Sequence, residues 1–133
     1  MRLTPRPLTD ETFAPYGRIL EAKADRFQVV ASDAEAKGWQ VGLNRVVDRE
    51  HPSVHRHLNT DEIFAPSAGH AVLVLAPPDR PDEVEAFDLD RPLLVRAGVW
   101  HTTLVPGDPA LVLLAETLDP VSEDHPLPEP VRV

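Results

Sequence analysis

The sequence contains no cysteine and no hydrophobic run long enough to cross a membrane. The absence of cysteine excludes a disulfide framework, a thiolate metal site and a cysteine nucleophile. The longest aliphatic runs, at residues 71–76 and 110–115, fall far short of the roughly 20 residues that a membrane helix needs. The first residues contain no apolar stretch that could form the core of a signal peptide. We therefore expect a cytoplasmic protein with no membrane partner.

Basic residues are also scarce, because 13 lysines and arginines face 22 aspartates and glutamates, which gives a net charge of −9. A surface this acidic repels polyanions, so nucleic acid is not an expected partner. The 133 residues have the size of one domain and suffice to bury a core without covalent cross-links. We expect a single domain over residues 1–133.

Proline, by contrast, is abundant, with 15 residues in 133. Proline cannot donate a hydrogen bond to a β-ladder, so it suits turns and strand ends better than helices. Between the turn signals lie short apolar runs, at a spacing of about 8–12 residues that is typical of a sandwich or barrel. The fold class is therefore predicted to be all-β. The runs that we predict to be strands are Phe27–Ala31, Gln40–Val47, Ser53–His57, Glu62–Pro66, Ala71–Ala76, Val84–Phe87, Leu93–Arg96, Trp100–Val105 and Ala110–Thr117.

Only the beginning of the chain has a helical pattern. Thr9 or Asp10 can cap a short turn that continues to Ala14, and Pro15 and Gly17 end it. We place the barrel portion at about residues 40–118. The proline-rich tail at 119–133 is predicted to be extended, and either frayed or laid across a neighbouring surface.

The most informative stretch contains His55 and His57, two residues apart, followed by Glu62. Side chains at positions i and i+2 of a strand face the same side, so the two imidazoles point to one place. Glu62 follows a possible turn and can open an adjacent strand, and His101 lies at the start of a later predicted strand. Three imidazoles and one carboxylate suit a divalent transition ion (Mn, Fe, Co, Ni or Zn) better than calcium or magnesium, which prefer more oxygen ligands.

The predicted metal ligands are thus His55, His57, Glu62 and His101, and Glu62 and His101 are also the predicted catalytic residues. Four protein ligands in an octahedral arrangement leave two positions free, which is room for a bidentate substrate. Glu62 could supply a fixed negative charge or accept a proton. The alternative interpretation is that His55 and His57 are surface residues of a strand and that Glu62 is a solvated charge.

This spacing resembles the first motif of the cupin family. That motif reads His-x-His, three or four residues, Glu, six residues and Gly, and the chain matches it at His55, His57, Glu62 and Gly69. The resemblance implies a double-stranded β-helix, which is a small jelly-roll barrel with the metal inside.

The second cupin motif, Pro-x-Gly-x-x-His-x-x-x-Asn, is matched in part. Gly98 and His101 agree with it, whereas Arg96 and Val105 stand at the proline and asparagine positions. The ligand position of the motif is therefore present, with flanks that differ from the family pattern.

A narrower resemblance, to the ureidoglycolate lyases, covers most of the chain. It begins at residues 7–9 and 13–21, and its order and spacing agree to about residue 119. These enzymes are cupins of allantoin breakdown that cleave ureidoglycolate to glyoxylate and urea, so the resemblance implies a metal-dependent carbon–nitrogen lyase. Further matching segments are Asn44-Arg45, Arg56-His57, Phe64-Ala65-Pro66, Leu75-Ala76-Pro77-Pro78 and Gly98-Val99-Trp100-His101.

The chain differs from these lyases at the metal motif itself. They usually carry Glu-Arg-His where this chain has His55-Arg56-His57, and a glutamine at the position of Glu62. They also tend to follow the tryptophan with His-His-Pro, where this chain has His101-Thr102-Thr103. The chain thus combines the scaffold of the lyases with the metal motif of the wider cupins.

Two further residues are predicted to contact a small anionic substrate. A protein of net charge −9 repels an anion at long range, so its site must be locally positive. Arg45 matches an arginine of the lyases and could add to the charge of the metal, or it could be a solvated residue that faces outward. Phe64 shares the parity of Glu62 and could form a wall of the pocket or belong to the core.

Three classes of function fit these residues. The first is a lyase acting on ureidoglycolate or a related small hydroxy acid. The second is a cupin metalloenzyme of another reaction type, such as an Fe-dependent dioxygenase or an isomerase. The third is a non-catalytic small-molecule-binding domain, since a fold does not fix a function. Cupins are often dimers, and the edges of an open jelly roll favour pairing, so we expect a homodimer.

Overall fold

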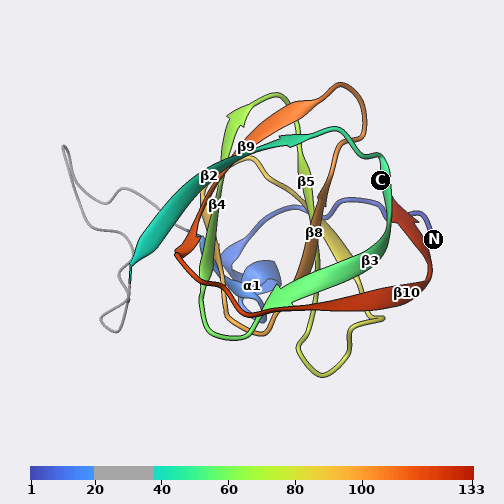
Figure 1. Cartoon of the computed structure of the whole chain (residues 1–133). Coiled ribbons are helices and arrows are strands. Elements are labelled where there is room, and N and C mark those ends of the chain that lie inside the picture. Colours follow the sequence, from blue (N-terminus) through green and yellow to red (C-terminus); the bar gives the residue numbers. More distant parts are fainter. Residues whose placement is uncertain (20–37) are drawn as a thin grey trace.

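The structure is a computed structural model that describes residues 1–19 and 38–133. In these two stretches the chain forms one short helix and ten strands, which lie in two antiparallel five-stranded sheets (Figure 1). This confirms the predicted all-β fold class with one short N-terminal helix. The elements are α1 (Asp10–Phe13), β1 (Gly17–Ile19), β2 (Trp39–Val46), β3 (Glu50–His57), β4 (Glu62–Ala68), β5 (Val72–Ala76), β6 (Glu85–Asp88), β7 (Leu93–Val95), β8 (Trp100–Leu104), β9 (Ala110–Thr117) and β10 (Ser122–Arg132).

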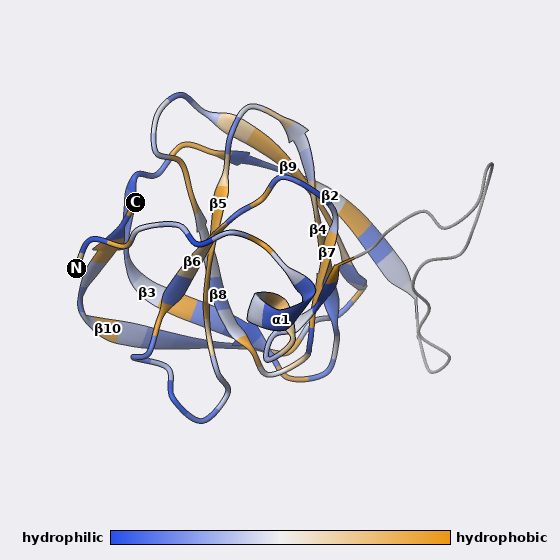
Figure 2. Cartoon of the chain, turned by 180° about the vertical axis from the view of Figure 1, so that it is seen from behind, coloured by the Kyte–Doolittle hydropathy of each residue, from blue (hydrophilic) through white to orange (hydrophobic). Residues whose placement is uncertain are grey.

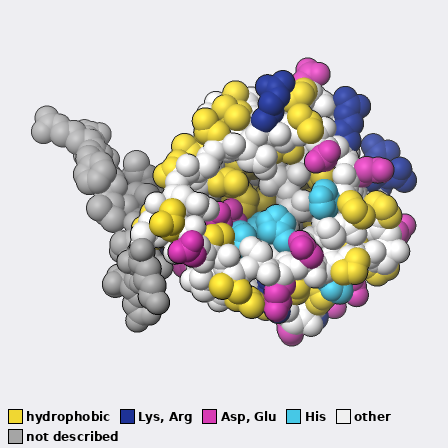
Figure 3. Space-filling view, viewed as in Figure 1, with side chains coloured by type: hydrophobic (Ala, Val, Ile, Leu, Met, Phe, Trp, Pro, Cys, Tyr) yellow, Lys and Arg dark blue, Asp and Glu magenta, His cyan; other side chains and the backbone are white. Residues whose placement is uncertain are grey.

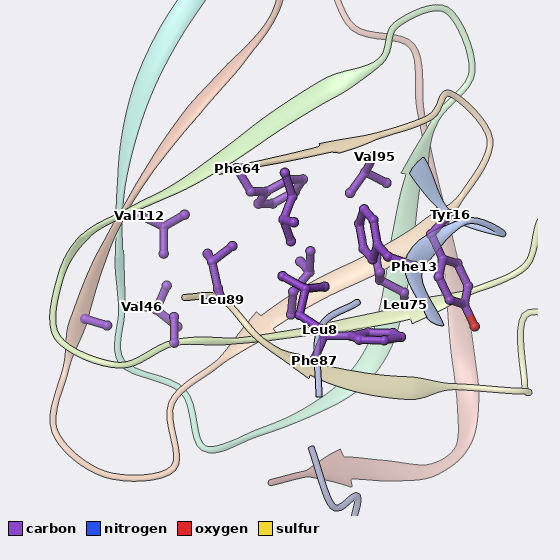
Figure 4. Close-up of a cluster of buried hydrophobic side chains, with 14 of the residues drawn as sticks. Leu8, Phe13, Tyr16, Val46, Phe64, Leu75, Phe87, Leu89, Val95 and Val112 are labelled. Carbon is purple, nitrogen blue, oxygen red and sulfur yellow. The ribbon is translucent and has the colours of Figure 1, made fainter. Parts of the chain in front are cut away.

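The two sheets enclose the main hydrophobic core. One sheet has the strand order β1-β7-β4-β9-β2, and the other has the order β10-β3-β8-β5-β6. Side chains from both sheets and from the N-terminal segment meet between them (Figure 4). The labelled core residues are Leu8, Phe13, Tyr16, Val46, Phe64, Leu75, Phe87, Leu89, Val95 and Val112.

Strand β5 is buried on both of its faces, which explains its continuous run of apolar residues (Figure 2). Leu73 and Leu75 point into the core between the sheets. Val72 and Val74 belong to a second cluster, on the other face of the same sheet, which β10 and the N-terminal residues help to cover. A strand buried on both faces needs no polar alternation, in contrast to a strand with one face in water.

The predicted helical turn is present and is capped as expected. The Oγ1 of Thr9 accepts a hydrogen bond from the backbone N–H of Thr12 at 3.1 Å. This contact satisfies one of the free N–H groups at the start of the helix. Phe13 is fully buried, and its ring packs edge-on against Phe87 of β6 at a centroid distance of 5.7 Å. The helix therefore contributes an aromatic anchor to the core.

Strand β1 was not predicted. Gly17, which we expected only to end the helical turn, begins this strand and is the register partner of Val95 in β7. A Cβ atom at this position would lie 1.7 Å from the carbonyl oxygen of Leu94, so the close approach of the two strands requires glycine. Three residues are too few to show the period-2 pattern by which strands are predicted.

Eight of the predicted strands correspond one by one to β2 through β9. The prediction for Ala110–Thr117 has the same bounds as β9, whereas β3 begins at Glu50 rather than at Ser53. The predicted strand Phe27–Ala31 lies outside the described residues.

The proline-rich tail is extended, as predicted, but it forms a strand of the second sheet rather than lying on a neighbouring surface. As β10 it pairs with β3, where Ser122 is the register partner of His57 and Asp124 of His55 (Figure 1). The register shifts between Pro126 and Val131. Strand β10 is at the edge of its sheet, where proline is tolerated because the missing N–H is not needed by a second neighbour.

In the part of the chain that the structure describes, no helix is long and apolar enough to cross a membrane.

Candidate metal centre

The structure brings the four predicted metal ligands together in the interior. His55 and His57 project from β3, His101 from β8 of the same sheet, and Glu62 from the start of β4 in the facing sheet. One ring nitrogen from each histidine lies within 4.8 Å of the others. The Oε2 of Glu62 is 2.9 Å from the Nε2 of His101 and 3.4 Å from the Nε2 of His57.

Burial argues against the alternative that these groups are solvated surface residues. Only 8% of His57, 4% of Glu62 and 3% of His101 is exposed, and His55 is half-buried. Figure 3 shows histidine side chains near the middle of one face of the molecule.

The electrostatics of the cluster keep the carboxylate charged. Burial by itself raises the pKa of Glu62, but the imidazoles of His101 and His57 outweigh it and hold this pKa at about 2. Burial, with a smaller contribution from His101, lowers the pKa of the His55 imidazole to about 4. The contact with Glu62 raises the pKa of His57. At neutral pH the cluster therefore contains an ionised Glu62 and a neutral His55.

The donor atoms of the cluster fit a metal ion. The Oε2 of Glu62 and the Nε2 of His101 are buried and form no hydrogen bond among the described residues. The Nδ1 of His101 donates a hydrogen bond to the carbonyl oxygen of Val99 at 3.1 Å, so its Nε2 is oriented toward Glu62. The Nδ1 of His57 lies 2.8 Å from the Oγ of Ser122. Metal-binding histidines are usually oriented in this way by a partner on the other ring nitrogen.

A second carboxylate, which sequence reasoning missed, lies beside His57 and Glu62. Glu116 of β9 places its Oε2 3.1 Å from the Nε2 of His57, and its Oε1 accepts a hydrogen bond from the Nε2 of Gln40 at 2.8 Å. Together with His57 and Glu62 it forms a second group of side chains that could hold a metal ion. A signal was present, because Glu116 follows Val112 and Leu114 on the inward-facing parity of a predicted strand.

The two predicted substrate contacts lie in different surroundings. Phe64 is 2% exposed, belongs to the main core and places its ring 5.4 Å from that of His101, so it contacts the centre and the core at once. Arg45 is exposed on β2, on the opposite side of the strand from the buried Val46. The structure does not bring Arg45 to the histidine cluster, and its contact with substrate stays a prediction.

Curated proteins of similar sequence point to one family. A ureidoglycolate lyase from Rhizobium etli is 30% identical to this chain over 123 aligned residues, which cover 75% of the chain and 74% of that protein. The chain belongs to the ureidoglycolate lyase family. Another member of this family, from Agrobacterium fabrum, is 27% identical over 76% of the chain and 75% of its own length. No protein-family profile matches the chain.

Solved structures show that this member of the ureidoglycolate lyase family has the cupin fold. A cupin 2 domain-containing protein from Halorhodospira halophila superposes with a TM-score of 0.52 and 19% identity, over 86% of this chain and 82% of that one. A dTDP sugar isomerase from Desulfovibrio desulfuricans superposes with a TM-score of 0.54 and 20% identity, over 90% and 85% of the two chains. At this level of identity the likeness concerns the fold alone, and it confirms the predicted jelly-roll architecture.

Proposed function

We propose that this protein is a metal-dependent lyase that cleaves ureidoglycolate, or a related small hydroxy acid, to glyoxylate and urea. Membership of the ureidoglycolate lyase family supports the substrate class. The observation that carries the metal dependence is the buried convergence of three histidines on Glu62, with donor atoms of Glu62 and His101 left without hydrogen bonds. Buried polar atoms without partners are rare in folded proteins, and a bound cation would satisfy these.

The proposed reaction breaks one carbon–nitrogen bond and needs no redox partner. The carbinol hydroxyl of ureidoglycolate loses its proton, and its oxygen forms the aldehyde C=O of glyoxylate. The electron pair of the C–N bond passes to the ureido nitrogen, which takes up a proton and leaves as urea. A divalent ion in this centre would act as a Lewis acid toward the oxygens of the substrate.

The side chains of the centre divide the remaining tasks. The ring nitrogens of His55, His57 and His101 would hold the ion, together with the Oε2 of Glu62. Because its pKa is about 2, Glu62 stays ionised and supplies a fixed negative charge, which favours the first of its two predicted roles. Phe64 places an apolar ring beside His101, where it would form one wall of the centre.

One observation favours a second candidate, a cupin metalloenzyme of another reaction type. The side chain of His55, where the lyases usually carry glutamate, belongs to the histidine cluster, and Glu62 replaces their usual glutamine. The ligand set is therefore that of the wider cupins, among which dioxygenases and isomerases occur. A non-catalytic small-molecule-binding cupin is the third possibility.

One purified sample distinguishes these candidates. We expect about one divalent transition ion per chain by elemental analysis, and release of glyoxylate when ureidoglycolate is added. His101→Ala should abolish glyoxylate release, whereas His70→Ala should not, because the His70 side chain is 60% exposed and pairs with Asp88. Bound metal without glyoxylate release would exclude the lyase and favour another reaction type. A chain that takes up no metal under any loading condition would exclude both metalloenzymes.

We also propose that the protein is a homodimer. Among the described strands β2 is at the edge of its sheet, and it exposes 68% of Val41 and 65% of Leu43. Exposed edge strands with apolar side chains favour association with another chain. Light scattering on the purified protein should give the mass of two chains, and the mass of one chain would contradict this proposal.

A further inference from the structure

Glu116 is not part of the cupin motif, but its carboxylate lies beside His57 of the candidate metal centre. We propose that Glu116 is a fifth protein ligand of the metal ion, held in place by Gln40, so that three histidines and two glutamates form the centre. This inference rests on the proposed metal binding. It concerns a residue on β9, far along the sequence from the first cupin motif.

The first argument is the environment of the Glu116 carboxylate. Its Oε2 is buried without a hydrogen bond and points to His57, whose Nε2 is 3.1 Å away. Its Oε1 accepts a hydrogen bond from Gln40 at 2.8 Å, which fixes the orientation of the carboxylate. A buried carboxylate oxygen without a hydrogen bond is costly, and a bound cation would compensate this cost more fully than the contact with His57 alone.

The second argument is the repulsion between two carboxylates. One carboxylate oxygen of Glu116 lies within 4.8 Å of one of Glu62, and both residues form ion pairs with histidines. Both Glu62 Oε2 and His101 Nε2 are buried atoms without hydrogen bonds in the same cluster, in side chains only 5% and 3% exposed. Like charges this close in a buried site repel, and a divalent cation between them would offset the repulsion more strongly than the contact with His57 that both carboxylates share.

A fifth ligand changes what the centre can bind. Two carboxylates neutralise a divalent ion, whereas Glu62 alone would leave one net positive charge. Five protein ligands also leave one free position in an octahedron rather than two. A bidentate substrate would then need Glu116 to leave the ion, so Glu116 determines which substrates the centre accepts.

The test measures metal binding rather than activity. The full chain is stripped of metal with a chelator and titrated with Co(II), and its affinity and visible absorption spectrum are recorded. We expect Glu116→Gln, which keeps the shape and removes the charge, to weaken Co(II) binding by about 10–100-fold and to shift the spectrum. Glu83→Gln is the matched control, because Glu83 is an exposed glutamate paired with Arg80. Wild-type affinity and spectrum in Glu116→Gln would overturn the inference.

Two further measurements show whether a negative result refutes the role of Glu116, the role of Gln40 or the proposed metal binding. If Glu116 only pairs with His57, Glu116→Gln lowers the melting temperature of the metal-free chain and leaves the Co(II) spectrum unchanged, which overturns the inference. Gln40→Leu, an independent variant, should lower the affinity for Co(II) several-fold while the Glu116 carboxylate remains, and an unchanged affinity there would overturn the role of Gln40. A wild-type chain that binds no Co(II) would instead refute the proposed metal function itself.

Discussion

His55 and His101 are register partners across the antiparallel pair of β3 and β8, and their ring centroids are 4.3 Å apart. His57 lies two residues further along β3, on the same face of the sheet. One cross-strand pair and one two-residue spacing thus place three imidazoles together. The register of β3 against β8 therefore decides whether the three histidines converge, because a slip by one residue would turn the side chains of one strand to the other face.

Removing two of these imidazoles should abolish metal binding. We expect the double variant His55→Ala, His57→Ala to contain no metal by elemental analysis, since two of the convergent donors are lost. His51→Ala is a matched control on the same strand, because His51 contacts Ser53 rather than the cluster. A double variant that keeps one ion per chain would show that the ion lies elsewhere.

Ser122 should affect metal affinity without contacting the metal. Its Oγ lies 2.8 Å from the Nδ1 of His57 and orients the ring. We expect Ser122→Ala to weaken Zn(II) or Co(II) binding by about 10-fold, the effect typical of a partner behind a metal-binding histidine. Ser53→Ala, on the paired strand, should leave the affinity unchanged. Equal affinities for both variants in a calorimetric titration would contradict this role.

Two variants of Phe64 can distinguish its role in core packing from its predicted contact with substrate. Truncation to alanine should cost about 3–5 kcal/mol of unfolding free energy, as for other buried aromatic residues, whereas Phe64→Leu should cost less than about 1.5 kcal/mol. Because its ring faces His101, we expect Phe64→Leu to keep the metal and to raise the KM for ureidoglycolate. Chemical denaturation and steady-state kinetics measure the two effects. An unchanged KM would assign Phe64 to the core alone.

Gly69 of the first cupin motif should be required for stability. Its φ is +73°, and a Cβ atom there would lie 3.0 Å from the Cα of Ala110 and from the carbonyl oxygen of Pro109. We expect Gly69→Ala to cost about 1–3 kcal/mol of unfolding free energy, from backbone strain and this close contact. Gly107→Ala is the control, because no atom lies within 4 Å of its Cβ position. Similar melting temperatures for both variants would contradict the argument.

Removal of the metal should destabilise the protein. Carboxylate oxygens of Glu62 and Glu116 lie within 4.8 Å of each other, and a cation that binds only the folded state would relieve their repulsion. At a free Zn(II) or Co(II) concentration 100 times the Kd, we expect a gain of about 2.7 kcal/mol. This gain corresponds to a rise in Tm of about 10 °C for a chain of this size. Scanning calorimetry with and without chelator measures it, and equal transitions would argue against a bound ion.

Strand positions were predictable in this chain because short-range rules govern them. Alternation and turn residues located β2 through β9, and the abundance of proline excluded a helical fold. β1 was missed because three residues show no periodicity, and its glycine is explained only by the carbonyl oxygen of Leu94 on the neighbouring strand. The tail was predicted to be extended, but its place beside β3 depends on contacts distant in sequence.

By itself the sequence determined the chemistry of the centre. The absence of cysteine leaves imidazole and carboxylate as the strong ligands, and the two-residue spacing of His55 and His57 puts both on one face of a strand. Only the tertiary structure decided which other strands face them. Ser122 and Glu116 joined the cluster because β10 pairs with β3 and because β9 packs beside β4 in the facing sheet. The alternation of residues along the sequence indicates on which face of its strand a side chain lies. It does not indicate which strand pairs with that strand, since pairing is fixed by the packing of the whole barrel.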